Sequence, residues 1–241
     1  MRGDILLRRN FGGSLPLTHQ VNNRKGHINK KENTTRSISV DRLDRRQIVS
    51  GENEDLYSHN KFYLEKMLKF RTLSLFEAIN AASARVVIDA LLLLDAEDST
   101  RPITLFLNSP GGEINSGFGI YDVIKFIRSE VKIVCTGLCA SIATIILIAA
   151  KKENRLSLPN TRFLIHQPLI SGTIRGSSSE IQIHAREIKK TRDRINSLLA
   201  QETGKNFEVM EKDTDRDFWM LSDEAIEYGL ISKIISKHSE V

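Results

Sequence analysis

Short apolar segments alternate with helical patterns along most of this chain, and this alternation restricts its fold more than any other feature. Three segments have the length and apolar character of buried strands: Ile103–Leu107, Val131–Val134 and Arg162–Ile165. Helical patterns lie before and between them: Ala81–Leu94, Phe118–Ile127 and Ser141–Ala150. Strands that alternate with helices build sheets covered by helices, so we predict the α/β class.

A long helix is expected near the C-terminal end. Ser177, followed three residues later by Glu180, is typical of a helix start, and the helical pattern continues to about Glu202 before Gly204. A shorter helix is expected over residues 222–229, which begin with Ser and Asp and end with Gly.

The N-terminal region differs in composition from the rest of the chain. Its first 50 residues hold eleven Lys or Arg and four Asp or Glu, a charge of +7, whereas the remaining residues sum to −2. Because this region has little apolar surface to bury, we expect residues 1–55 to form a basic flexible arm, retained or removed by processing. Residues 56–241 would form the folded domain. An organelle transit peptide is the alternative for the arm, but its acidic residues argue against it.

Several classes of protein are excluded. The basic charge belongs to the arm, so no nucleic-acid surface is expected on the domain. No apolar run reaches the roughly 20 residues of a membrane span. The sequence has no phosphate-binding glycine motif and no metal-ligand spacing, so we expect no cofactor and no metal. The only cysteines, Cys135 and Cys139, suggest a reducing compartment. Among reducing compartments, a cytoplasm is favoured over an organelle matrix or stroma.

Ser141 is the first candidate for chemistry. It follows the strand Val131–Thr136 and a turn of small residues, Gly137–Ala140, and it begins an apolar helix. A hydroxyl at a helix N-terminus is close to N–H groups that stabilise negative charge, which suits a nucleophile that generates an oxyanion. Capping of the helix by the Ser141 side chain is the alternative interpretation.

Three other segments complete the candidate set. His166 follows the strand that ends at Ile165, where α/β proteins place their sites, although a structural histidine is the alternative. The Gly111-Gly112 pair offers backbone N–H groups to a ligand, or forms an ordinary tight turn. Asp213, Asp215 and Asp217 form an acidic run that would otherwise be a solvated loop.

These segments occur in the order of a known family. From about Arg71 onward the chain resembles the proteolytic subunits of the Clp protease, ClpP. The matching segments are Leu91–Leu94 with the acids after it, Asn108–Gly112, Ile120–Asp122, Gly137–Ala143, Leu158–Asn160, Ile165–Pro168, Ile183–Glu187, Asp213–Asp217 and Glu224–Leu230.

The resemblance implies a serine endopeptidase. Ser141 would be the nucleophile, His166 the general base and then acid, and Asp217 the group that orients the imidazole. Asp213 is the alternative if the local register differs. The backbone N–H groups of Gly112 and Ile142 would form the oxyanion hole.

The family also implies an architecture and partners. The fold would be a crotonase-like spiral of β-β-α units with a protruding handle helix, Glu180–Glu202. Subunits would form homo- or hetero-oligomers of two stacked heptameric rings, with Arg216 coupling ring contact to the triad. An AAA+ unfoldase such as ClpX, ClpA or ClpC would supply unfolded polypeptides. It would dock in a pocket that includes Phe106, Phe126, Leu156 and Leu158.

Some features depart from the family and leave alternatives open. The arm is longer than the usual N-terminal loop, and Thr104 and Thr136 replace larger apolar groups at the docking pocket. A weakly or conditionally active ring subunit that needs a second ClpP-like chain is therefore the second interpretation. A crotonase-type acyl-CoA enzyme is the third, because it shares the fold and the oxyanion hole.

Overall fold

A computed structural model describes residues 62–169 and 175–241. A helical segment over residues 62–69 leads into the first strand. The named elements follow in this order: β1 (Thr72–Leu75), α2 (Ala81–Glu97), β2 (Ile103–Ser109), α3 (Ile114–Phe126), β3 (Val131–Ala140), α4 (Ile142–Ala149), η1 (Lys152–Asn154), β4 (Arg155–Ser157), β5 (Arg162–Ile165), α5 (Ser178–Thr203), α6 (Phe207–Asp213), β6 (Phe218–Leu221), α7 (Ser222–Tyr228), β7 (Lys233–Ile234) and η2 (His238–Glu240).

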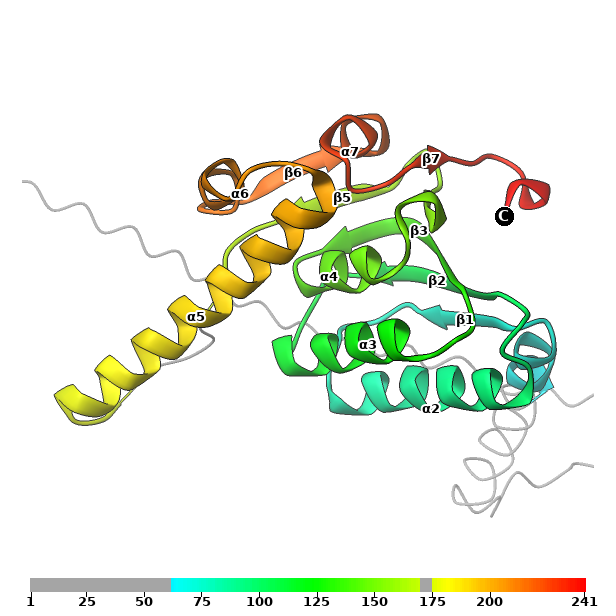
Figure 1. Ribbon diagram of the computed structural model, residues 1–241, viewed down its shortest axis with the longest axis horizontal. Coiled ribbons are helices and arrows are strands. Elements are labelled where there is room, and N and C mark those ends of the chain that lie inside the picture. Colours follow the sequence, from blue (N-terminus) through cyan, green and yellow to red (C-terminus); the bar gives the residue numbers. More distant parts are fainter. Residues whose placement is uncertain (1–61, 170–174) are drawn as a thin grey trace, which may run out of the picture. The chain divides into compact units, whose positions relative to one another are not determined.

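The α/β class is confirmed, with a mainly parallel sheet. The strands β1, β2, β3, β4 and β7 are neighbours in that order, and all of these pairs are parallel. Helices α2, α3 and α4 lie along the sheet (Figure 1). The predicted arm, residues 1–55, lies outside the described residues.

Strand β3 is longer than predicted, and its two halves pair with different strands on the same side. Its first half pairs with β4 through Ile133–Cys135, and its second half pairs with β5 through Leu138–Ala140. The predicted turn over Gly137–Ala140 is therefore wrong, because pairing with β5 keeps Leu138–Ala140 in a strand, although Gly137 before them has a positive φ of 65°. This extension carries β3 directly to Ser141.

The core lies between the sheet and the helices. Helix α4 is buried along its whole length, and its apolar residues pack with those of β2, β3 and α3. This burial supplies the hydrophobic free energy that holds the first residue of α4 in place. No helix among the described residues has the length and apolar character needed to cross a membrane.

Helix α5 matches the predicted handle in position and length. Its start has the predicted capping box, in which Ser177 and Glu180 exchange hydrogen bonds, and Gly204 ends it in a left-handed conformation. Its buried residues begin only at Ile195, so the first half of the helix extends away from the sheet (Figure 1).

Candidate active site

Sheet register brings the predicted site residues together. Ser109 on β2 is opposite Cys139 on β3, so Gly111 reaches the level of Ser141 two residues later. Ala140 is opposite Leu164 on β5, and the Ser141 N–H donates to the Leu164 carbonyl at 2.8 Å. Parallel strands end at the same edge of a sheet. Residues at three strand ends therefore form one row.

An antiparallel pair adds the carboxylate to this row. Ile165 on β5 is opposite Phe218 on β6, so His166 and Asp217 are the next residues along the same ladder. Nδ1 of His166 lies 3.7 Å from Oδ1 of Asp217. The His166 side chain is 12% exposed, whereas that of Asp217 is 63% exposed. The pair is thus in register but open to solvent on its carboxylate side.

Ser141 has an unusual backbone conformation. Its φ of 58° and ψ of −128° lie outside the regular regions for a residue with a side chain, at a cost of about 1–3 kcal/mol. Its side chain makes no capping hydrogen bond to α4, so the capping interpretation is wrong. A strained turn between strand and helix presents a serine hydroxyl at a sheet edge.

The backbone at Gly111 and Gly112 lies so close to neighbouring residues that neither position has room for a side chain. A Cβ on Gly111 would lie 2.6 Å from Cβ of Ser141, and a Cβ on Gly112 would lie 2.0 Å from the Ile79 carbonyl oxygen. Ile79 accepts a bond from Glu113 N–H and donates one to the Gly111 carbonyl, both at 2.8 Å. Both hydrogen bonds to Ile79 come from the neighbours of Gly112, namely Gly111 and Glu113. In an extended chain, the N–H groups of consecutive residues point to opposite sides, so the Gly112 N–H points away from Ile79, toward β3.

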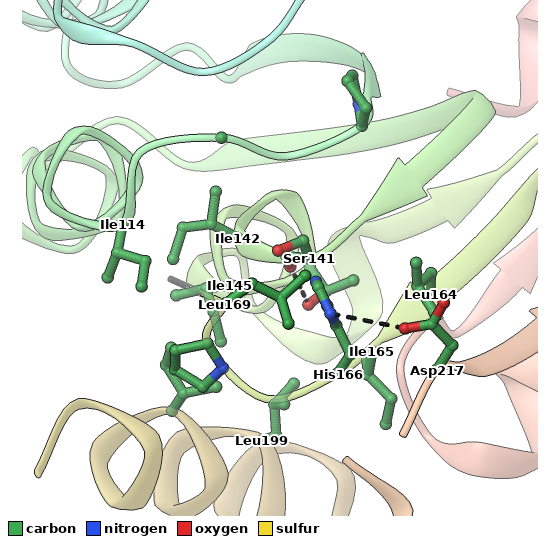
Figure 2. A pocket seen from close by; sticks show the side chains of 15 residues that line it. Ile114, Ser141, Ile142, Ile145, Leu164, Ile165, His166, Leu169, Leu199 and Asp217 are labelled. Carbon is green, nitrogen blue, oxygen red and sulfur yellow. Dashed lines mark hydrogen bonds and ion pairs between the residues drawn. The ribbon is translucent and has the colours of Figure 1, made fainter. Parts of the chain in front are cut away.

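The row borders a pocket of about 410 Å³. Ser141 and His166 lie together at its wall, with Asp217 behind the imidazole (Figure 2). Most of the remaining lining is apolar and comes from α3, α4 and α5: Ile114, Ile142, Ile145, Ile195 and Leu199. No hydrogen bond joins the Ser141 hydroxyl to His166 within residues 62–169 and 175–241 of the structure. A pocket with this lining suits an apolar side chain beside a reacting carbonyl.

The three aspartates of the acidic run, Asp213, Asp215 and Asp217, lie in different environments. Asp213 ends α6 and accepts a hydrogen bond of 2.8 Å from the Tyr228 hydroxyl, so it faces α7 instead of the pocket. Asp215 is joined to Gln167, whose side-chain amide donates to its carbonyl at 2.8 Å. Arg216 is exposed, with Nε 3.7 Å from an Asp215 oxygen.

Three of the predicted docking residues share one small apolar cluster. Leu156 is buried with Val134 and Ile235, and Phe106 and Leu158 pack against them. Phe126 is instead 80% exposed at the end of α3. The cluster lies on β2, β3 and β4, away from the row of site residues.

The two cysteines are buried in β3. Burial, and then the neighbouring Cys139 thiol, raise the pKa of Cys135 well above its ordinary value, so this thiol stays protonated and unreactive. Within the described residues, no group of three His, Cys, Asp or Glu side chains is arranged to hold a metal ion.

Sequence reasoning missed several residues of the pocket. Ile114, Ile195 and Leu199 line it, although their sequence pattern indicates only helix packing. Thr144 was also missed, and a hydroxyl in an otherwise apolar helix was the signal that could have found it.

Comparisons with known proteins agree with the sequence resemblance. The Clp protease family profile matches residues 55–238. ATP-dependent Clp protease proteolytic subunit 2 of Treponema denticola is 45% identical over 178 residues, which cover 74% of this chain and 88% of the relative. Proteolytic subunit 3 of a Synechococcus species is 45% identical over 170 residues, which cover 70% and 84%.

A solved structure leads to the same family. The similar structure is a point mutant of ClpP1 from Listeria monocytogenes, with a TM-score of 0.67 and 46% identity, covering 73% of this chain and 96% of that one. These matches favour a peptidase over the acyl-CoA enzyme considered from the sequence. Fold, sheet-edge site and relatives are consistent with one another: the chain belongs to the Clp protease family.

Proposed function

We propose that this chain is a serine endopeptidase subunit that cleaves unfolded polypeptides to short peptides through an acyl-enzyme. The observation that carries the proposal is the row of residues at the sheet edge. A strained serine, a histidine and a carboxylate occupy neighbouring register positions beside one pocket. This is the order of groups that nucleophilic acyl transfer requires.

The proposed chemistry begins at Ser141. Its Oγ attacks the carbonyl carbon of the scissile peptide bond while Nε2 of His166 takes the hydroxyl proton. His166 then gives that proton to the departing amine, and the C–N bond breaks to leave an ester on Ser141. Water repeats the sequence to release the acid. Asp217 orients the imidazole through Nδ1 and stabilises its positive charge.

Two backbone N–H groups would stabilise the oxyanion of each tetrahedral intermediate. Gly112 follows β2 with its N–H on the side away from Ile79. Ile142 is the first residue of α4, where N–H groups have no partner within the helix. Donors of this kind contribute about 10²–10³ in rate each.

A covalent probe tests the nucleophile directly. The purified chain is treated with a fluorophosphonate or a β-lactone and its intact mass is measured, with Ser141→Ala as the control. We expect one adduct that the variant lacks. An adduct that persists in Ser141→Ala contradicts the assignment of the nucleophile.

Assembly into two stacked heptameric rings is part of the proposal. The exposed first half of α5 is available for contact between rings, and Arg216 lies beside Asp217. Arg216→Ala is expected to reduce both the double-ring species in native mass spectrometry and probe labelling. Loss of double rings with full labelling would separate Arg216 from the triad. The proposed location is the bacterial cytoplasm, since the relatives are bacterial.

An AAA+ unfoldase of the ClpX, ClpA or ClpC type is the proposed partner. The docking pocket would use the apolar cluster of Phe106, Leu156 and Leu158, with Phe126 from a second surface. Phe106→Ser is expected to weaken retention of such an ATPase on the assembled rings while peptide cleavage continues. Unchanged retention would remove the pocket from the proposal.

A conditionally active ring subunit is the second candidate function. The observation that favours it is the 3.7 Å separation of His166 and Asp217, which exceeds a hydrogen bond. Labelling that occurs only after addition of a second ClpP-like chain supports this candidate. Equal labelling with and without that chain supports the self-sufficient enzyme.

A further inference from the structure

Thr144 is the one hydroxyl-bearing residue of α4, whose other residues are Ile, Leu and Ala. It is 1% exposed and lies at the wall of the site pocket. Its hydroxyl donates to the Ser141 carbonyl at 2.7 Å, and its backbone N–H donates to the same oxygen at 3.0 Å. A threonine in a helix often bonds a carbonyl one turn back. Here the acceptor belongs to the strained serine.

Peptide planarity extends this contact to the next residue. The Ser141 carbonyl and the Ile142 N–H belong to one rigid peptide unit and point in opposite directions. Two donors from Thr144 hold the carbonyl toward the inside of α4. The Ile142 N–H is therefore held away from the helix, at its N-terminal end.

The backbone conformation of Ser141, which sets the direction of the Ser141–Ile142 peptide unit, is not one that the residue favours by itself. With φ at 58° and ψ at −128°, Ser141 needs its surroundings to maintain its conformation. The bond from the Ser141 N–H to Leu164 fixes one side of the residue. The Thr144 hydroxyl acts on the other side, where the oxyanion donor is carried.

We propose that Thr144 is a positioning residue that sets the direction of the Ile142 N–H in the oxyanion hole. The inference rests on the proposed function, because it concerns the same tetrahedral intermediate. The proposed role requires no contact between Thr144 and the reacting atoms. It acts through the Ser141–Ile142 peptide unit, and its effect is greatest when the carbonyl oxygen of the substrate carries a full negative charge.

Removal of the Thr144 hydroxyl is expected to lower kcat and to leave KM nearly unchanged. Removal of a whole oxyanion donor lowers kcat by about 10²–10³, and a donor that only changes direction loses part of this. We therefore expect Thr144→Val to lower kcat roughly 3–10-fold on a short fluorogenic peptide. KM is expected to stay within about twofold, since the ground-state carbonyl makes weaker use of the hole.

Two variants and a control separate positioning from packing. Thr144→Ser keeps the hydroxyl and is expected to retain wild-type kcat. Thr144→Ala removes the hydroxyl without a β-branched side chain and is expected to match Thr144→Val. The matched control is Thr203→Val, because the buried Thr203 hydroxyl also donates to a helix carbonyl, that of Leu199, at 2.7 Å. This control is expected to keep wild-type kcat.

A tetrahedral inhibitor provides the readout that a purely structural role would not change. A peptide boronate places an oxygen in the oxyanion hole, so its inhibition constant should rise by the same factor as kcat falls in Thr144→Val. The pH at which kcat/KM rises should not move, because His166 is not altered.

Each outcome decides the inference. Wild-type kcat in Thr144→Val overturns it, and so does an equal loss in Thr203→Val or in Thr144→Ser. If neither Thr144→Val nor Thr144→Ala folds, the hydroxyl serves folding and the positioning role is rejected. A wild-type chain that shows no Ser141-dependent cleavage, either alone or with a second ClpP-like chain, overturns the proposed function itself. An active wild type with an unaffected Thr144→Val rejects only the role of Thr144.

Discussion

His166 and Asp217 face each other one residue beyond the β5–β6 ladder, yet Nδ1 of His166 lies 3.7 Å from Oδ1 of Asp217. The backbone of β5 and β6 already places both residues, so only the side chains must move to form a hydrogen bond. Catalytic hydrogen bonds of unliganded enzymes are often long and tighten in the substrate complex. The exposure of Asp217 leaves room for that adjustment.

Asp217→Asn tests this relationship. An amide in this position favours the wrong imidazole tautomer, and in other serine proteases the equivalent change lowers kcat by about 10⁴. We expect a loss of about 10³-fold or more in peptide cleavage, measured with the purified assembled protein. A loss below about tenfold would remove Asp217 from the triad.

Asp213→Asn is the matched control, because it removes a charge from the same acidic run. Asp213 faces Tyr228, and an Asn oxygen can still accept the hydroxyl bond. Peptide cleavage is expected to stay within about twofold of wild type. A large loss would mean that Asp213 serves His166 instead.

Gly111→Ala is expected to impair the site through a steric clash. Its φ is 92°, and the added Cβ would lie 2.6 Å from Cβ of Ser141 and 2.7 Å from the Ala140 carbonyl. The rate of fluorophosphonate labelling should fall by about tenfold or more, since Ser141 must shift.

Gly119→Ala is the control for this change. Gly119 lies in α3, and its nearest neighbour would be 3.5 Å from the added Cβ. A helical Ala raises stability by about 0.5–1 kcal/mol, so Tm should rise slightly and labelling should not change. Equal labelling rates in both variants would contradict the close approach of Gly111 to Ser141.

Arg155 joins the ends of two helices from a buried position. Its guanidinium is 1% exposed, donates to the carbonyls of Ala150 and Ile148 at 2.9 and 3.1 Å, and pairs with the Glu202 carboxylate. Arg155→Met removes the donor to these carbonyls and leaves the Glu202 carboxylate paired with Lys125, whose Nζ lies 3.7 Å from its other oxygen. The apparent free energy of unfolding should fall by about 3 kcal/mol, measured by urea titration of Trp219 fluorescence.

A double-mutant cycle with Glu202→Gln checks the mechanism. If the ion pair matters, the double variant loses less than the sum of the two single variants. Additive losses would assign the effect of Arg155 to its carbonyl contacts alone.

Stability should decrease at alkaline pH because of Tyr228. Burial of the ring, and then its hydrogen bond and the charge of Asp213, raise the pKa of Tyr228 well above its usual value of about 10. The folded state keeps a proton that the unfolded state releases, so this contribution is complete below about pH 10 and is lost above it. Tyr228→Phe should flatten the fall of Tm between pH 9 and about 11. An unchanged slope would contradict this.

Local patterns predicted the elements that their own residues determine. The helix caps at Ser177 and Gly204, and the strand before Ser141, follow from nearby chemistry. The second half of β3 could not be predicted, because Leu138–Ala140 joins the sheet through its pairing with β5, whose sequence lies further along the chain. Such pairing overrides the turn preference of small residues.

The candidate site also has residues that could be predicted from the sequence and residues whose environment required the structure. Ser141 and His166 are candidates from their own segments, whereas Asp217 is selected by the resemblance to the Clp family, and the sheet edge brings the three together. A hydroxyl in an apolar helix marks Thr144 in the sequence, but its proposed role depends on the contact with the Ser141 carbonyl, which only the structure shows. The environment of Asp213 also required the structure, because Tyr228 is the residue that distinguishes it from Asp217.

The late position of β6 in the chain has a consequence during translation. A ribosome completes Ser141 and His166 before it adds Asp217, and β6 must leave the exit tunnel before it can pair with β5. A nascent chain thus lacks the carboxylate while most of its sheet can already fold. The proposed triad is therefore completed only by one of the last strand pairings that synthesis permits.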